Sequence, residues 1–97
     1  LHNTMSEQKL ELKILKYLKE TYPSAWIHKP NDRYTSGIPD LLICKDGKMI
    51  GIELKVGKNK PTKLQSHVLK LIERAGGCAG VAYSIEDVKT IIEKGAK

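Results

Sequence analysis

The residues of this chain with the clearest potential for chemistry are two carboxylates and a lysine on a predicted β-hairpin. Asp40 comes directly before one apolar run, and Glu53 and Lys55 lie at the end of a second run, with Asp46-Gly47 between them. Asp-Gly between β-prone segments is typical of a type I′ turn, which requires positive φ at both central residues. With these two residues as the loop, Asp40 faces Glu53 across the hairpin.

This register predicts a charged cluster on one face of the hairpin. Facing residues have Cβ atoms roughly 5 Å apart, and like charges there destabilise a sheet unless something offsets them. Strand alternation places Lys55 on the same face as Glu53. Such a trio could hold a hard divalent cation beside a positive group, or it could be a structural ion pair worth about 0–1 kcal/mol. Spacing alone leaves both interpretations open.

Hydrophobic patterning predicts the elements that would hold this hairpin in place. Apolar residues at helical spacing indicate the helices, and short β-branched or aromatic runs indicate the strands. In chain order we expect helix 7–21, edge strand 25–29, hairpin strands 41–44 and 49–54, helix 62–75, strand 78–83 and helix 84–94. The residues expected to face the core are Leu41, Ile43, Ile50, Ile52 and Leu54 of the hairpin, and Leu64, Val68, Leu71, Ile72 and Ala75 of the second helix. The fold class is therefore α/β, with the order α-β-β-β-α-β-α and a mixed sheet flanked by helices.

Length and charge indicate the class of partner. The 97 residues predict one domain over 5–97, with residues 1–4 before Met5 as a cloning remnant. Seventeen Lys and Arg against eleven Asp and Glu leave a net charge of +6, which favours a polyanion such as nucleic acid, although small lysine-rich proteins are also basic for solubility alone. Without a secretory signal or an apolar run near 20 residues, we expect a cytoplasmic protein with no membrane contact, and buried free thiols at Cys44 and Cys78.

The hairpin and the residues around it resemble a known nuclease signature. Gly37-Ile38-Pro39-Asp40 followed by Glu53-Leu54-Lys55 resembles the PD-(D/E)XK nucleases, and Ser36 together with Gln65 resembles the VRR-NUC family in particular, over about residues 7–83. The resemblance implies a restriction-endonuclease-like core and a metal-dependent endodeoxyribonuclease. The residues that it implies to be catalytic are Asp40, Glu53, Lys55 and Gln65.

The resemblance also implies a set of metal ligands, namely Glu7, Asp40, Glu53 and the carbonyl of Leu54. Glu11, one helical turn later, is the alternative to Glu7. An all-oxygen shell favours Mg²⁺, with Mn²⁺ expected to substitute, and no His/Cys cluster is present to select zinc. Lys55 could deprotonate a water or stabilise negative charge on the phosphate. Two neighbouring carboxylates oppose deprotonation of a lysine, which favours the second role.

Two further groups of residues are predicted to contact DNA or the reacting phosphate. Gln65 could complete a capping box with Thr62, or could reach the scissile phosphate or a water, and the resemblance favours the latter. Loop and helix-terminus positions supply the candidates for phosphate, sugar or base contact. These candidates are Arg33, Tyr34, Ser36, Lys58, Lys60 and Lys63.

Free-standing domains of the resembled family are similar to homodimeric enzymes that resolve Holliday junctions, and they are often phage-borne. A two-fold pair of active sites would cut two strands symmetrically, with branched DNA recognised by shape and phosphates. The strand around Trp26 and the last helix are the candidate dimer surfaces. Two alternatives remain, a basic nucleic-acid-binding module that does not cut, and a flap or restriction-type nuclease.

Overall fold

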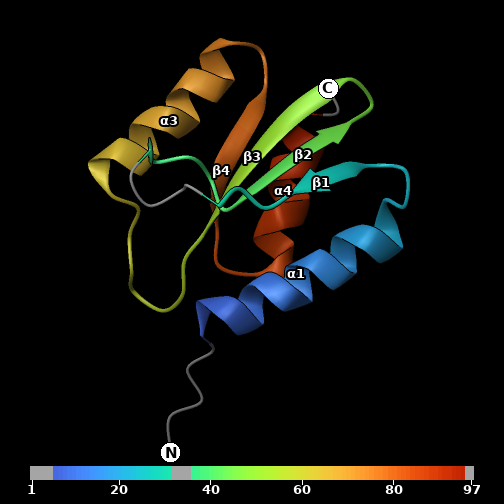
Figure 1. Ribbon diagram of the computed structural model, residues 1–97, viewed down its shortest axis with the longest axis horizontal. Helices are drawn as coiled ribbons and strands as arrows, with labels where there is room; N and C mark the ends of the chain where they lie inside the picture. The colour runs from blue at the N-terminus through green and yellow to red at the C-terminus, as the bar shows by residue number, and fades with distance from the viewer. Residues whose placement is uncertain (1–5, 32–35, 96–97) are drawn as a thin grey trace, which may run out of the picture.

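The computed structural model describes residues 6–31 and 36–95 (Figure 1). Its elements are α1 (Glu7–Thr21), β1 (Trp26–His28), β2 (Leu41–Lys45), β3 (Lys48–Leu54), α3 (Lys63–Arg74), β4 (Cys78–Ala82) and α4 (Ile85–Gly95). The four strands form one sheet in the order β1-β2-β3-β4, antiparallel except for the parallel pair β3–β4. The predicted α-β-β-β-α-β-α order and mixed sheet are therefore confirmed, as is the place of β1 at a sheet edge.

The hairpin between β2 and β3 turns at Asp46-Gly47, as predicted. The φ angles of these residues are +53° and +78°, which is the positive pair that this tight turn requires. The pairs Lys45–Lys48, Cys44–Met49 and Leu42–Gly51 follow the predicted register. The ladder ends at Leu41–Ile52, so Asp40 and Glu53 lie one position beyond the last paired rung.

Helices cover the two faces of the sheet unequally. Helices α1 and α4 lie against one face, whereas α3 packs against β3 and β4 on the other (Figure 1). The first face carries the main core, and its hairpin residues are almost completely buried. This core contains Leu41, Ile43, Ile50, Ile52 and Leu54 of the hairpin, Leu10, Ile14 and Leu18 of α1, and Val88, Ile91 and Ile92 of α4. Within 6–31 and 36–95, every helix is too short or too polar to span a bilayer.

The predicted inward face of α3 is wrong in part. Leu69 is the buried residue of this helix, whereas Leu64 and Leu71 are 46% and 44% exposed. Ala75 is also exposed, because the helix ends at Arg74 and Ala75 is its C-cap. Periodicity gives the apolar side of a helix. Among the described helices and strands, however, α3 packs mainly on β3 and β4, and this surface is narrower than the apolar side of the helix.

The prediction for the cysteines is also wrong in part, because Cys78 is buried but Cys44 is exposed, both with free thiols. Cys44 pairs across the sheet with Trp26 and Met49, which are 55% and 41% exposed. Cross-strand partners share a face, and α3 does not extend over this part of the sheet. In the part of the chain that the structure describes, the face of β1 and β2 opposite the main core is therefore partly open.

Gly37, in the segment before Asp40, packs closely against the start of α3. Its φ is +71°, and a Cβ at this position would lie 2.6 Å from Cγ of Leu64. Any side chain would therefore clash with Leu64 and would also strain the backbone. Glycine at this position lets the chain that leads to Asp40 run directly against α3.

Candidate active site

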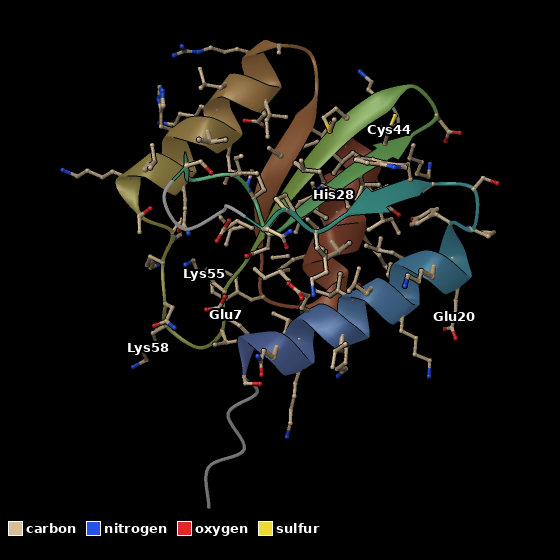
Figure 2. The ribbon with its side chains drawn as sticks, viewed as in Figure 1. Glu7, Glu20, His28, Cys44, Lys55 and Lys58 are labelled. Carbon is tan, nitrogen blue, oxygen red and sulfur yellow. The ribbon has the colours of Figure 1, made fainter. Side chains whose placement is uncertain are left out.

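A cavity of about 320 Å³ opens at the end of the sheet where β2 begins and β3 ends. Figure 2 shows Glu7 and Lys55 at this end of the molecule, away from Cys44 and Glu20. The structure brings all the predicted catalytic and metal-binding residues to this one cavity. Its lining consists of Glu7, Gln8, Glu11, Asp40, Glu53, Leu54, Lys55 and Gln65.

Asp40 is positioned by the end of the neighbouring strand. It is only 8% exposed, and its Oδ2 accepts a hydrogen bond of 2.8 Å from the backbone N–H of Leu54. Pro39 before it has no N–H to contribute to a ladder. The side chain of Asp40 therefore takes the place of the next backbone rung and lies beside Glu53.

Glu53 is the most deeply buried acid of the described chain, with 2% of its surface exposed. Burial, the charge of Asp40 and a hydrogen bond with Asp40 together raise the pKa of Glu53 to about 8, although the charge of Lys55 acts to lower it. Glu53 therefore holds a proton near neutral pH when nothing else offsets the charge of Asp40. Two acids in contact in a buried position are the electrostatic arrangement that a bound cation would relieve.

Lys55 lies on the same side of the strand as Glu53, as strand alternation predicts. Its Nζ is 3.8 Å from Oε2 of Glu53, and its side chain is 13% exposed. Its backbone N–H donates to the carbonyl of Ala82 at 3.2 Å, which ties this position to β4. The ammonium group is thus held at the rim of the carboxylate pair.

The two candidate glutamates of α1 differ in what they contact. Glu11 is an ion-pair partner of Lys29, and its side chain is 12% exposed. Glu7, in the first turn of the helix, is exposed, and its charge contributes to the raised pKa of Glu53. Glu11 also lines the cavity but already has a cationic partner, so Glu7 is the acid better placed to join the pair.

This difference predicts that Glu7→Gln weakens divalent-metal binding and Glu11→Gln does not. Loss of the carboxylate at Glu7 is expected to raise the dissociation constant for Mn²⁺ by about 10-fold, the effect typical of a supporting ligand. Isothermal titration calorimetry measures this constant without any cleavage. If Glu11→Gln weakened Mn²⁺ binding by this amount and Glu7→Gln did not, the metal ligand would instead be Glu11, one helical turn later.

Gln65 takes part in a capping box at the start of α3. Its Oε1 accepts from the backbone N–H of Thr62 at 2.8 Å, and its own N–H donates to Oγ1 of Thr62 at 3.1 Å. The side chain nevertheless lines the cavity. The amide oxygen serves the cap, which leaves the amide NH₂ as the group able to donate into the cavity. The two interpretations of Gln65 are therefore compatible.

The residues at this cavity fit a hard divalent cation. Within 6–31 and 36–95, no three His, Cys, Asp or Glu side chains converge as a complete ligand set. The fit rests instead on the close pair Asp40 and Glu53, with the Leu54 carbonyl and Glu7 as further oxygen donors. Mg²⁺ is commonly bound through one or two carboxylates while it keeps several waters, so an incomplete protein shell suits it.

The predicted DNA contacts that fall within the described residues lie outside the cavity lining. Arg33 and Tyr34 lie outside the described residues. The Oγ of Ser36 accepts from the backbone N–H of Ile38 at 3.4 Å, so this side chain orients the segment before Asp40. The remaining candidates, Lys58, Lys60 and Lys63, are exposed on the loop after β3 and at the start of α3.

Sequence reasoning missed two residues at this site. Gln8 lines the cavity but shows no pattern of its own in the sequence. Lys29, directly after β1, forms an ion pair with Glu11 of α1. This pair becomes apparent only when the fold brings the two segments together.

The raised pKa of Glu53 predicts how stability depends on pH in the presence of a chelator. The pKa is about 8 in the folded chain against an ordinary 4.5, so the unfolded chain binds fewer protons between these values. The free energy of unfolding should therefore fall as pH rises from about 4.5 to about 8, by up to about 1.4 kcal/mol per pH unit from this group. Urea denaturation at several pH values measures this slope. Glu53→Gln should flatten it, and a wild-type slope that is positive and unaffected by Glu53→Gln would contradict the assignment.

Comparison with solved structures finds a chain described as "VRR_NUC domain", which is 29% identical in sequence with a TM-score of 0.64. The match covers 86% of this chain and 94% of the other. No protein-family model matches the chain, and no curated protein matches it. The structural match therefore extends over most of both chains.

Proposed function

This chain belongs to the VRR-NUC family, and from that membership we propose that it is a divalent-metal-dependent endonuclease that hydrolyses phosphodiester bonds in branched DNA. The observation that carries the proposal is the pair of buried acids, Asp40 and Glu53, beside Lys55 in one cavity. Apolar residues of similar volume often stabilise a fold as well as buried charged groups do, or better, so a gain in stability alone does not account for this cluster. A buried acid whose pKa is strongly raised, such as Glu53, is typical of a functional site when it lines a cavity.

Six of the eight residues that line the cavity have a role in this proposal. When bound, a divalent cation neutralises negative charge on the phosphate and favours deprotonation of a water molecule. Asp40 and Glu53 hold the cation, assisted by the Leu54 carbonyl and Glu7. The ammonium of Lys55 stabilises the negative charge that develops on the phosphate oxygens. The amide NH₂ of Gln65 orients the phosphate or the attacking water by a hydrogen bond.

We further propose Mg²⁺ as the cation, with Mn²⁺ able to substitute, and a homodimer as the active form. One chain carries one cavity of this kind among its described residues, and symmetrical cutting of two strands requires a two-fold pair. The net charge of +6 supports recognition of DNA through its phosphates and shape.

A comparison of DNA substrates tests the proposal. The protein is incubated with a four-way junction, a flap and a linear duplex, each with Mg²⁺, with Mn²⁺ and with EDTA. We expect paired cuts in the junction that require the divalent cation, and analytical ultracentrifugation should show a dimer on DNA. Preference for the flap or the duplex would favour a flap or restriction-type nuclease. Tight binding with no cutting under any condition would identify a non-cleaving module, and a monomer on DNA would exclude junction resolution.

A further inference from the structure

We infer that Tyr83, together with Lys58 and Lys60, forms a subsite that holds one DNA strand beside the cavity. In this subsite the sugar or base of a nucleotide packs on the tyrosine ring, and flanking phosphates lie at the two lysines. The inference rests on the proposed nuclease function. It adds Tyr83, a residue that the sequence motif does not include.

The first argument is position, because Tyr83 lies next to the proposed catalytic lysine. Strands β3 and β4 are parallel, and their last paired residues are Leu54 and Ala82. The backbone N–H of Lys55 then donates to the carbonyl of Ala82 at 3.2 Å. Tyr83 follows directly, at the same end of the sheet as the carboxylate pair. A strand that crosses the cavity would reach this ring within a short distance.

The second argument is that the ring is fixed in place while remaining exposed. Its hydroxyl donates to the carbonyl of Asn59 at 2.7 Å, and its backbone N–H donates to Oδ2 of Asp87 at 2.8 Å. The residue is nevertheless 37% exposed. An aromatic ring held at both ends loses little freedom when a nucleotide packs on it, so the contact is more favourable than one made by a mobile side chain.

The third argument is charge. Gly57, Lys58, Lys60 and Tyr83 line an open hollow of about 480 Å³. Figure 2 shows Lys58 on the loop at the same end of the molecule as Lys55. Among residues 6–31 and 36–95, neither loop lysine takes part in an ion pair.

Among the described residues, neither acid at the nearby start of α4 forms an ion pair with the loop lysines. Asp87 accepts from the backbone N–H of Tyr83, and Glu86 pairs with Lys89 at 3.4 Å. An aromatic ring beside two exposed lysines that form no ion pair among the described residues is the combination that binds the bases and phosphates of a single strand.

The test measures DNA binding with Ca²⁺ in place of Mg²⁺, by fluorescence anisotropy of a labelled flap with a single-stranded arm. Tyr83→Leu removes the ring and should weaken binding about 10-fold, the effect typical of losing one stacked base. Tyr83→Phe keeps the ring and should bind within about threefold of wild type. Lys58→Ala with Lys60→Ala should weaken binding and lower the salt dependence by about one to two ions. Lys94→Ala, at the far end of α4, is the control for loss of one exposed lysine.

The outcomes separate this inference from the proposed function. If wild type cuts DNA with Mg²⁺ but Tyr83→Leu binds as tightly as wild type, the subsite is wrong and the nuclease function stands. If Tyr83→Phe weakens binding as much as Tyr83→Leu, the tyrosine only braces the loop, which also overturns the inference. If Tyr83→Leu does not fold, the variant that carries both Lys58→Ala and Lys60→Ala provides the test. Unchanged DNA binding by this double variant would overturn the subsite. A wild-type protein that neither binds nor cuts DNA removes both proposals.

Discussion

Asp40→Asn is expected to lower the rate of DNA cleavage at least about a thousandfold. Asparagine can still accept the hydrogen bond from the backbone N–H of Leu54, so the hairpin end should keep its structure. The charge that we propose to hold a divalent cation is lost, however, and metal-assisted stabilisation of a reacting phosphate contributes several kcal/mol, which is several factors of ten in rate. Single-turnover cleavage of the preferred substrate at saturating Mg²⁺ measures this rate.

Asp46→Asn is the matched control for this variant. Asp46 lies in the hairpin turn with a side chain that is 83% exposed, and asparagine tolerates its positive φ well. Cleavage by this variant should equal that of wild type. Equal activity of wild type and Asp40→Asn, with Mn²⁺ affinity unchanged, would show that the carboxylate pair is not the metal site.

Lys55→Met is expected to lower the cleavage rate about 100- to 1000-fold while leaving DNA binding nearly unchanged. Methionine fills much of the same volume, but the positive charge 3.8 Å from Glu53 is lost, and with it the group that would stabilise developing charge on the phosphate. Cleavage rates and anisotropy measured in parallel separate the two effects. Lys45→Met is the control, because Lys45 also pairs with a neighbouring acid, at 2.7 Å, but lies at the hairpin turn.

Lys55→Arg separates the two possible roles of this lysine. Arginine remains charged at any accessible pH and cannot act as a base. Substantial activity in Lys55→Arg would support electrostatic stabilisation, which the position beside Glu53 favours. Activity as low as that of Lys55→Met, together with a changed pH–rate profile, would instead support proton transfer by Lys55.

The parts of this site that could be predicted from the sequence are those with local signals. The Asp46-Gly47 turn fixes the register of the hairpin, and the register brings Asp40 and Glu53 together without any knowledge of the other elements. The capping box of Thr62 and Gln65 is likewise a short-range pattern, and it is present. Such features depend on residues only a few positions apart.

The parts that could not be predicted depend on which elements meet in space. Leu64 and Leu71 are exposed because, within 6–31 and 36–95, the sheet contacts of α3 are with β3 and β4, and the spacing of apolar residues along the helix does not reveal this. The pair Glu11–Lys29 joins α1 to the end of β1, and the neighbourhood of Tyr83 joins β4 to the loop after β3. These contacts link segments far apart in the chain, so they appear only once the fold is known.

The hydrogen bond between the Asp40 side chain and the backbone of Leu54 makes the candidate site sensitive to local unfolding of the hairpin. Oδ2 of Asp40 accepts the last hydrogen bond between the two hairpin strands, so this side chain becomes ordered when the chain folds. The entropy of ordering it is lost at that stage and not when a ligand arrives. Fraying of the hairpin at this end would release the acid at the same moment as the strands. Conditions that fray only this end of the hairpin should therefore abolish the proposed metal binding and cleavage well before the whole domain unfolds.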